Sequence, residues 1–175
     1  MFESYDHWPQ YQPLRDALQP HWQAIRQETL ALLQVQGAYT AWPERGIYRG
    51  QWDVFGLRWQ NQWLPSCVQA PLTSAWLRPF EPMLVNAGFS LMLPRTHITP
   101  HHGYTQTVLR THLGLVVPPA SIDRLALRVG REVCTWQEGA WLLFDDTQEH
   151  EAWNQTDQLR IVLLMDLVRG QRAAA

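Results

Sequence analysis

The chain has 175 residues, 46% of them hydrophobic, and a formal net charge of −2. This length and composition predict one globular domain over residues 1–175 with a substantial core. The weak charge argues against nucleic acid as a partner. There is no apolar run long enough to span a membrane, no signal peptide and only two cysteines, so we expect a cytoplasmic protein. All 14 basic residues are arginine, which excludes Schiff-base chemistry on a lysine.

The part of the chain before residue 88 predicts helices and one strand pair. Residues 10–35 have helical periodicity, and Pro20 forces a break or a new first turn within them. Apolar and polar residues alternate between positions 46 and 64, which predicts two paired strands. Residues 74–87 predict a further helix, although two prolines interrupt it.

From residue 88 onward the pattern changes to strands only. We expect strands at residues 89–93, 107–117, 123–129, 140–145, 149–154 and 159–168. Many short strands with turn residues between them are typical of a β-sandwich or a β-barrel. The last residues of the chain, 172–175, are expected to fray.

Histidines gather in two segments of this β-rich part. Residues 100–118 read PHHGYTQTVLRTHLGLVVP and residues 144–160 read FDDTQEHEAWNQTDQLR, and together they contain four of the seven histidines. Imidazoles on neighbouring strands suit a transition metal with open coordination positions. Arg160 lies inside an apolar strand, where a charged side chain needs a partner. The sequence therefore predicts a metal site with an anion-binding residue beside it.

A longer motif surrounds these histidines. It consists of a His two residues before a Gly, R-x-H-L-G-L-x-x-P, F-D-D-x-x-x-H-E-x-W, an Arg ten residues after the last His, and an upstream F-S-x-M-x-P. Its positions are His101, Gly103, Arg110, residues 112–115, Pro118, residues 144–146, His150, Glu151, Trp153 and Arg160, with Phe89, Ser90, Met92 and Pro94 upstream. In this motif the chain resembles the aspartyl/asparaginyl β-hydroxylase family of iron(II)- and 2-oxoglutarate-dependent oxygenases. The match covers residues 88–168, and residues 1–87 match more weakly.

The resemblance implies a mainly β fold. This fold is a double-stranded β-helix, or cupin-like jelly roll, with flanking N-terminal helices and a catalytic core over residues 88–168. Such a barrel is a natural container for a small metal site, because inward side chains from facing strands converge and the open mouth admits ligands. The implied cofactor is Fe(II), with 2-oxoglutarate and O2 as co-substrates.

The resemblance also implies the metal ligands. His101 and His150 would bind the metal directly. Most enzymes of this chemistry carry a carboxylate two residues after the first His, but Gly103 occupies that position here. In the family a water molecule takes the vacant place, and the matching Asp that would hold this water is Asp146, with Asp145 the less favoured alternative. By geometry alone zinc fits two imidazoles and a water equally well, and only the resemblance favours iron.

The co-substrate carboxylate needs a cationic partner in an apolar barrel, and arginine binds a carboxylate through two parallel hydrogen bonds. Arg160 is the leading residue for this role. Arg110 and His112 lie two residues apart, so they share one face of their strand and could complete the carboxylate pocket with the Ser90 hydroxyl. Met92 also matches the family motif, but as a side chain it could equally fill the core.

Three functions fit these residues. The first is hydroxylation of an aspartyl/asparaginyl-type residue or of a small amino-acid-derived substrate, with release of succinate and CO2. The second is hydroxylation of a lipid or fatty-acyl chain, against which the lack of a hydrophobic N-terminal anchor counts. The third is a non-catalytic jelly-roll binding protein, against which the retained histidines and arginines count. We expect a small molecule or a peptide as the substrate, and the chain lacks the helical repeats that help larger β-hydroxylases to bind proteins.

Overall fold

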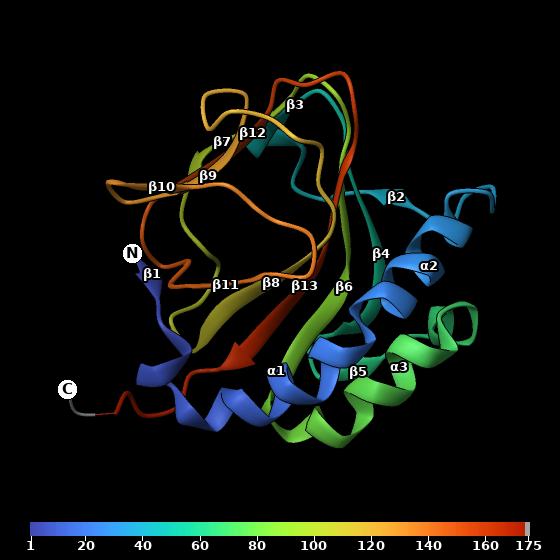
Figure 1. The fold of residues 1–175 in the computed structure, drawn as a ribbon, viewed down its shortest axis with the longest axis vertical. Helices are drawn as coiled ribbons and strands as arrows, with labels where there is room; N and C mark the ends of the chain where they lie inside the picture. The colour runs from blue at the N-terminus through green and yellow to red at the C-terminus, as the bar shows by residue number, and fades with distance from the viewer. Residues whose placement is uncertain (174–175) are drawn as a thin grey trace.

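The computed structural model describes residues 1–173, which form two antiparallel β-sheets and a layer of helices (Figure 1). The strands of the larger sheet are β1 (Phe2–Glu3), β2 (Thr40–Ala41), β4 (Trp52–Trp59), β5 (Gln62–Trp63), β6 (Leu84–Met92), β8 (Val108–Val116), β11 (Trp141–Phe144) and β13 (Arg160–Val168). Their order is β1-β11-β8-β13-β6-β4-β2, with β5 paired to β4.

The smaller sheet covers part of the larger one. Its strands are β3 (Tyr48–Arg49), β7 (Thr96–His101), β9 (Leu125–Val129), β10 (Glu132–Cys134) and β12 (His150–Asn154), and their order is β10-β9-β12-β7-β3. The helices are α1 (Gln12–Leu18), α2 (Trp22–Leu32) and α3 (Pro71–Leu77). They lie together on the side of the larger sheet that faces away from the smaller sheet (Figure 1). No helix within residues 1–173 is long and apolar enough to cross a membrane.

The alternation of side chains along β13 explains the two cores. Ile161 and every second residue after it pack in the cluster between the larger sheet and the helices. Val162 and Leu164 pack in the cluster between the two sheets. Arg160 and Asp166 have the same parity as these two residues, so β13 directs both charged side chains to the face that the smaller sheet partly covers. Both are buried.

The helical predictions are confirmed in the first segment and wrong in part of the second. The expected break at Pro20 is present, because a 3-10 turn at Gln19–His21 separates α1 from α2. The expected helix over residues 74–87 is wrong after residue 83. Helix α3 begins earlier, at Pro71, a 3-10 segment spans Arg78–Met83, and residues 84–87 belong to β6. Two prolines in that segment prevent a continuous α-helix.

The six strands expected after residue 88 are all present within a few residues of the expected bounds, whereas the pattern does not predict β1, β2, β7 and β10. The strand pair expected over residues 46–64 is β4 with β5, whereas β3 joins the other sheet. The Ala173 N–H donates to the His7 carbonyl at 2.8 Å, and the expected fraying of residues 172–175 stays a prediction. Residues 174–175 lie outside the described residues. A single domain over residues 1–175 stays a prediction.

Candidate metal and co-substrate site

Two histidines meet where the strands of the smaller sheet pair. His101 ends β7 and His150 begins β12, the two are register partners, and their ring centroids lie 4.2 Å apart. The Nδ1–H of His101 donates to the Thr99 carbonyl at 2.8 Å, and the Nδ1–H of His150 donates to the Gln148 carbonyl at 2.9 Å. These bonds fix the tautomer and leave the Nε2 lone pair of each ring free for a metal.

Burial keeps both rings neutral. It lowers the pKa of His150 to about 3, with a further lowering from the neighbouring His101, and it also lowers the pKa of His101. Only a neutral imidazole has a lone pair to give to a metal. Among residues 1–173 no group of three or more His, Cys, Asp or Glu side chains converges as a complete metal site. The pair would therefore leave several coordination positions to other ligands.

The carboxylate of Asp146 fills the space beside Gly103. The Gly103 N–H donates to the Asp146 carbonyl at 2.7 Å, and a Cβ built on Gly103 would collide with the Asp146 carboxylate. Asp146 is fully buried, and neither carboxylate oxygen has a hydrogen-bond partner among the described residues. Burial raises its pKa to about 6, while the nearby Arg110 acts in the opposite direction. A carboxylate without a hydrogen-bond partner, 3.4 Å from the Arg110 guanidinium, thus lies where a side chain at position 103 would be.

Asp145 has a different environment from its neighbour. The Arg169 guanidinium donates to its carboxylate through Nη1 at 3.1 Å, and the Thr147 hydroxyl donates to it at 2.8 Å. These bonds lower the pKa of Asp145. Because the oxygens of Asp145 are occupied in this way, its carboxylate is less available to an added ligand than that of Asp146, which has no hydrogen-bond partner among the described residues.

Arg160 is a buried cation without an acidic partner. Its Nη1–H donates to the Ser90 carbonyl at 3.2 Å, and the centre of its guanidinium lies 4.5 Å from the Trp136 ring centroid. Its Nε has no partner, and no carboxylate of residues 1–173 forms an ion pair with it. Burial lowers its pKa to about 9, so the guanidinium is still charged at neutral pH. An uncompensated buried charge is costly, and an anionic ligand would offset that cost.

His112 presents a free N–H in the same cavity. Trp136 Nε1–H donates to His112 Nδ1 at 3.1 Å, so Nδ1 carries no proton and Nε2 does. That Nε2 is buried without a partner among the described residues. Burial holds the pKa of His112 well below its usual value, and the charges of Arg160 and Arg110 lower it further. The ring is therefore a neutral donor next to the Arg160 cation.

The remaining expected residues divide between the cavity and the core. Ser90 Oγ accepts a hydrogen bond from Trp52 Nε1 at 2.9 Å, which leaves the hydroxyl proton free to donate. Arg110 lines the cavity, but Asp166 accepts from its Nε at 2.7 Å and from its Nη2 at 3.1 Å, so its charge is already paired. Met92 is fully buried in the core between the sheets and does not line the cavity. An open cationic face on Arg110 and a co-substrate contact of Met92 are thus not supported by the geometry.

These side chains line two adjoining cavities. The inner cavity, of about 30 Å³, contains His101, His150, His112, Arg160 and Ser90 in its walls. The mouth cavity, of about 440 Å³, shares Trp52, His101 and Arg110 with it. A ligand that reaches the inner cavity can therefore extend into the mouth. Trp52, Trp42 and Trp59, three of the tryptophans that the sequence offers as possible cleft residues, line the mouth cavity. The sequence did not point to Trp136, because nothing in the alternation pattern distinguishes it from the other tryptophans of the chain.

The chain matches the family model described as aspartyl/asparaginyl beta-hydroxylase over residues 19–170. It is 36% identical to human aspartyl/asparaginyl beta-hydroxylase over 166 residues, which is 90% of this chain and 21% of that protein. It is 50% identical over 94 residues to ornithine lipid ester-linked acyl 2-hydroxylase of Rhizobium tropici, which is 54% of this chain and 33% of that protein. The chain thus spans about a fifth to a third of the length of these relatives.

Solved structures show the same fold. A prolyl-4-hydroxylase of Pseudomonas putida matches with a TM-score of 0.56 at 15% identity, over 83% of this chain and 86% of that chain. A 2OG-Fe(II) oxygenase family oxidoreductase of Burkholderia pseudomallei matches with a TM-score of 0.55 at 15% identity, over 83% of this chain and 79% of that chain. These likenesses confirm the expected jelly-roll fold. Together with the family model, which covers most of the chain, the comparisons show that the chain belongs to the aspartyl/asparaginyl β-hydroxylase family.

Proposed function

We propose that this chain is an iron(II)- and 2-oxoglutarate-dependent hydroxylase. One observation carries the proposal: a pair of neutral histidines and a buried, unpaired guanidinium line the same cavity. The histidines offer two nitrogen ligands, and Arg160 offers the charge that a dicarboxylate co-substrate needs. Family membership adds the redox chemistry, because two imidazoles by themselves would suit zinc as well.

The residues present fit the metal. The Nε2 atoms of His101 and His150 would hold it, and the Asp146 carboxylate, which has no hydrogen-bond partner among the described residues, would hold a water ligand beside it. Bound iron(II) would supply the oxidative chemistry that converts 2-oxoglutarate and O2 to succinate and CO2 and puts one oxygen atom into a substrate C–H bond. The carbonyls of Thr99 and Gln148 keep both rings in the tautomer that this binding requires.

The residues present also fit the co-substrate. Arg160 would pair with the distal carboxylate of 2-oxoglutarate, and the free Nε2–H of His112 and the Ser90 hydroxyl would donate to the same group. Arg110 would have a different role from the contact with the co-substrate carboxylate that the sequence predicts. Because Asp166 neutralises it, we assign it to keeping Asp146 in place, at 3.4 Å from the nearer carboxylate oxygen.

The substrate of the reaction has two alternatives. One human relative is named for aspartyl and asparaginyl residues, and the rhizobial relative, with the higher identity over a shorter segment, is named for an ester-linked acyl group. An aspartyl/asparaginyl-type or small amino-acid-derived substrate therefore competes with an acyl substrate for the same iron site. A non-catalytic binding protein has little support, because every side chain that the chemistry needs is present.

Binding of 2-oxoglutarate to Mn(II)-loaded protein, measured by calorimetry, tests this function together with succinate formation in the Fe(II)-loaded protein. His101→Ala and His150→Ala should abolish metal binding, while His97→Ala, on the same strand as His101, should not. Arg160→Ala should weaken 2-oxoglutarate binding by roughly 30-fold or more, and Arg160→Lys by less. Arg131→Ala, at an exposed position, is the matched control. Wild-type affinity in Arg160→Ala would refute the clamp, and loss of metal binding in His102→Ala but not in His101→Ala would refute the ligand assignment.

A further inference from the structure

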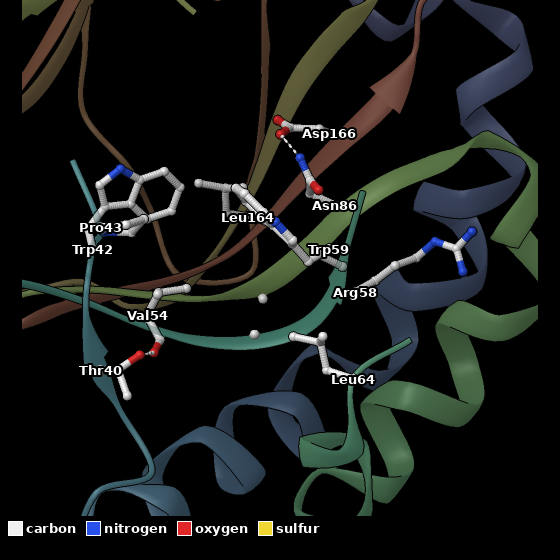
Figure 2. Close-up of a pocket in the computed structure, with 13 residues that line it drawn as sticks. Thr40, Trp42, Pro43, Val54, Arg58, Trp59, Leu64, Asn86, Leu164 and Asp166 are labelled. Atoms are coloured by element: carbon white, nitrogen blue, oxygen red, sulfur yellow. Dashed lines mark hydrogen bonds between the residues drawn. The ribbon is translucent and has the colours of Figure 1, made fainter. Parts of the chain in front are cut away.

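A third cavity opens beside the mouth, on the inner face of the larger sheet. It has a volume of about 210 Å³, and its walls come from β4, β6, β13 and the segment around β2. Figure 2 shows Val54, Leu64, Trp42 and Leu164 around this space. Its volume corresponds to roughly seven liquid-water volumes, which is far more than a single ordered water needs. We call it the lateral cavity.

The floor of the lateral cavity is bare backbone. Gly56 of β4 and Gly88 of β6 are register partners, and both line the cavity. A Cβ on Gly56 would lie 2.7 Å from Leu64 Cδ1, and a Cβ on Gly88 would lie 2.6 Å from the Phe55 carbonyl oxygen. Neither position accepts a side chain without movement of its neighbours. The sheet therefore carries two adjacent positions without side chains in the wall of the cavity.

The lateral cavity offers no free charge to a ligand. The Arg58 guanidinium points away from the space (Figure 2), because its Nε–H donates to the Leu84 carbonyl at 2.7 Å and Glu81 pairs with it at 3.1 Å. The Asp166 carboxylate at the other end is occupied by Arg110 and by Asn86, whose Nδ2–H donates to it at 2.8 Å. A carboxylate or ammonium group that entered would lose its hydration without gaining a partner. An apolar ligand has no such cost.

The lateral cavity is connected to the histidine pair through the mouth. It shares Trp42, Pro43, Trp59 and Asp166 with the mouth cavity. The mouth in turn shares His101 with the inner cavity. A substrate whose reactive carbon lies near His101 can therefore extend along the mouth into the lateral cavity, past Trp42, which stacks on Trp52 at a centroid distance of 4.2 Å.

We infer that the lateral cavity binds a hydrocarbon chain of the substrate and sets the length of chain that the protein accepts. This inference rests on the proposed function for the reacting end of the substrate, and it favours an acyl-type amphiphile over a substrate with an acidic side chain. The observation behind it is the combination of an apolar wall, a glycine floor, paired charges at both ends and continuity with the mouth.

The test is a binding series of neutral N-acylglycinamides with acyl chains of four to twelve carbons, measured by calorimetry on Mn(II)-loaded protein with 2-oxoglutarate. Each methylene buried in the cavity should tighten the dissociation constant by about fourfold until the cavity is full, after which the affinity levels off. Val54→Phe, which fills the cavity from β4, should move that plateau to shorter chains and weaken the longest probe by at least tenfold.

Two further variants complete the design. Val133→Phe makes the same substitution on an exposed strand of the smaller sheet and should leave the series unchanged. Thr40→Phe fills the lateral cavity from an exposed edge strand and replaces Val54→Phe if that variant does not fold. Affinities independent of chain length, or equal effects of Val54→Phe and Val133→Phe, would overturn the inference. Fe(II)-loaded wild-type protein that forms no succinate with any probe would instead count against the proposed function. The binding series uses Mn(II)-loaded protein and does not depend on turnover.

Discussion

At the scale of single residues, the site contains buried polar groups that lack partners and therefore lower the stability of the fold. Arg160, Asp146 and His112 are buried and each has at least one polar atom without a partner among residues 1–173. A buried donor or acceptor without a partner costs about 1–3 kcal/mol, and a charged one costs more. Three such groups in one region are expected of a binding site in which the ligands supply the missing hydrogen-bond and charge partners.

The first prediction concerns the cost of Arg160. Arg160→Met removes a buried charge that has no acidic partner and replaces it with an apolar side chain of similar length. The free energy of unfolding of the metal-free variant should rise by about 1–4 kcal/mol, the range found when buried ion pairs are replaced by packed apolar groups, because Arg160 carries the same desolvation cost without an acidic partner. The same variant should lose 2-oxoglutarate binding. Urea denaturation and calorimetry measure the two effects, and a variant less stable than wild type would show that Arg160 already has a compensating partner.

The second prediction concerns the protonation of His112. Because its pKa in the folded protein lies well below its usual value, the folded state binds this proton less tightly than the unfolded state. The stability that depends on neutral His112 is therefore present above about pH 6.5 and is lost as the pH falls. His112→Gln keeps an acceptor for Trp136 but does not titrate. Between pH 6 and pH 5 wild-type protein should lose about 1.2 kcal/mol relative to this variant, slightly less than the full effect of one pH unit because the unfolded histidine is not completely protonated at pH 6.

Urea denaturation of both metal-free proteins at each pH gives this difference directly, because His101, His150 and Asp146 titrate in both and their effects cancel. A constant difference in free energy of unfolding across this range would show that His112 is protonated in the folded state, and that its Nε2–H is not the donor assigned to it.

At the scale of elements, strand alternation explains which parts of the site were predictable. Arg110 and His112 on β8, and Arg160 on β13, share the face toward the inner cavity, as a period of two requires. The alternation does not predict which residue of a neighbouring strand a side chain contacts. Asp166 pairs with Arg110, which still lines the inner cavity, and this pairing depends on the register of β8 against β13.

Irregular segments are the other part of the structure that the sequence pattern does not predict. Strand β7 is short and contains Pro100, so it has little alternation to recognise, although it places His101. Trp136 lies outside any strand, between β10 and β11, yet it fixes the His112 tautomer. Residues 84–87 follow two prolines, and the local pattern predicts a helix there, whereas buried pairing with β4 and β13 makes them strand. In each case tertiary contacts, and not the local sequence pattern, determine the conformation of the segment.

The third prediction concerns the loop after β7 and the segment before β12, which share one space for a carboxylate. Gly103→Asp should weaken Mn(II) binding at least tenfold, because its side chain enters the space of Asp146 and brings two carboxylates together in a buried region. Adding Asp146→Gly to this variant should restore most of the affinity, since one carboxylate again occupies the space. Calorimetric titration of both variants tests this. Unchanged affinity in Gly103→Asp alone would mean that the two segments can separate.

At the scale of the whole molecule, the two faces of the larger sheet pack against different layers. Its helix side carries the more extensive apolar core, while its inner side carries the polar residues of the site and a smaller apolar core under the smaller sheet. His101 and His150 belong to the smaller sheet, and Arg160 and His112 belong to the larger one. A metal with bound 2-oxoglutarate would therefore link the two sheets, and ligand binding should be visible in the stability of the entire fold.

The last prediction uses this linkage. Ligands that bind only the folded state stabilise it by about 2.7 kcal/mol at a concentration 100 times the Kd, which corresponds to a rise in Tm of roughly 5–11 °C for a chain of this size. Mn(II) should raise the Tm of wild-type protein, and 2-oxoglutarate should raise it further only when Mn(II) is present. His101→Ala should lose both increments, because the co-substrate binds partly through the metal. Arg160→Ala should keep the Mn(II) increment and lose the second one. Scanning calorimetry with each combination of ligands separates these outcomes, and a 2-oxoglutarate increment that survives without metal would show that the dicarboxylate binds to the arginine alone.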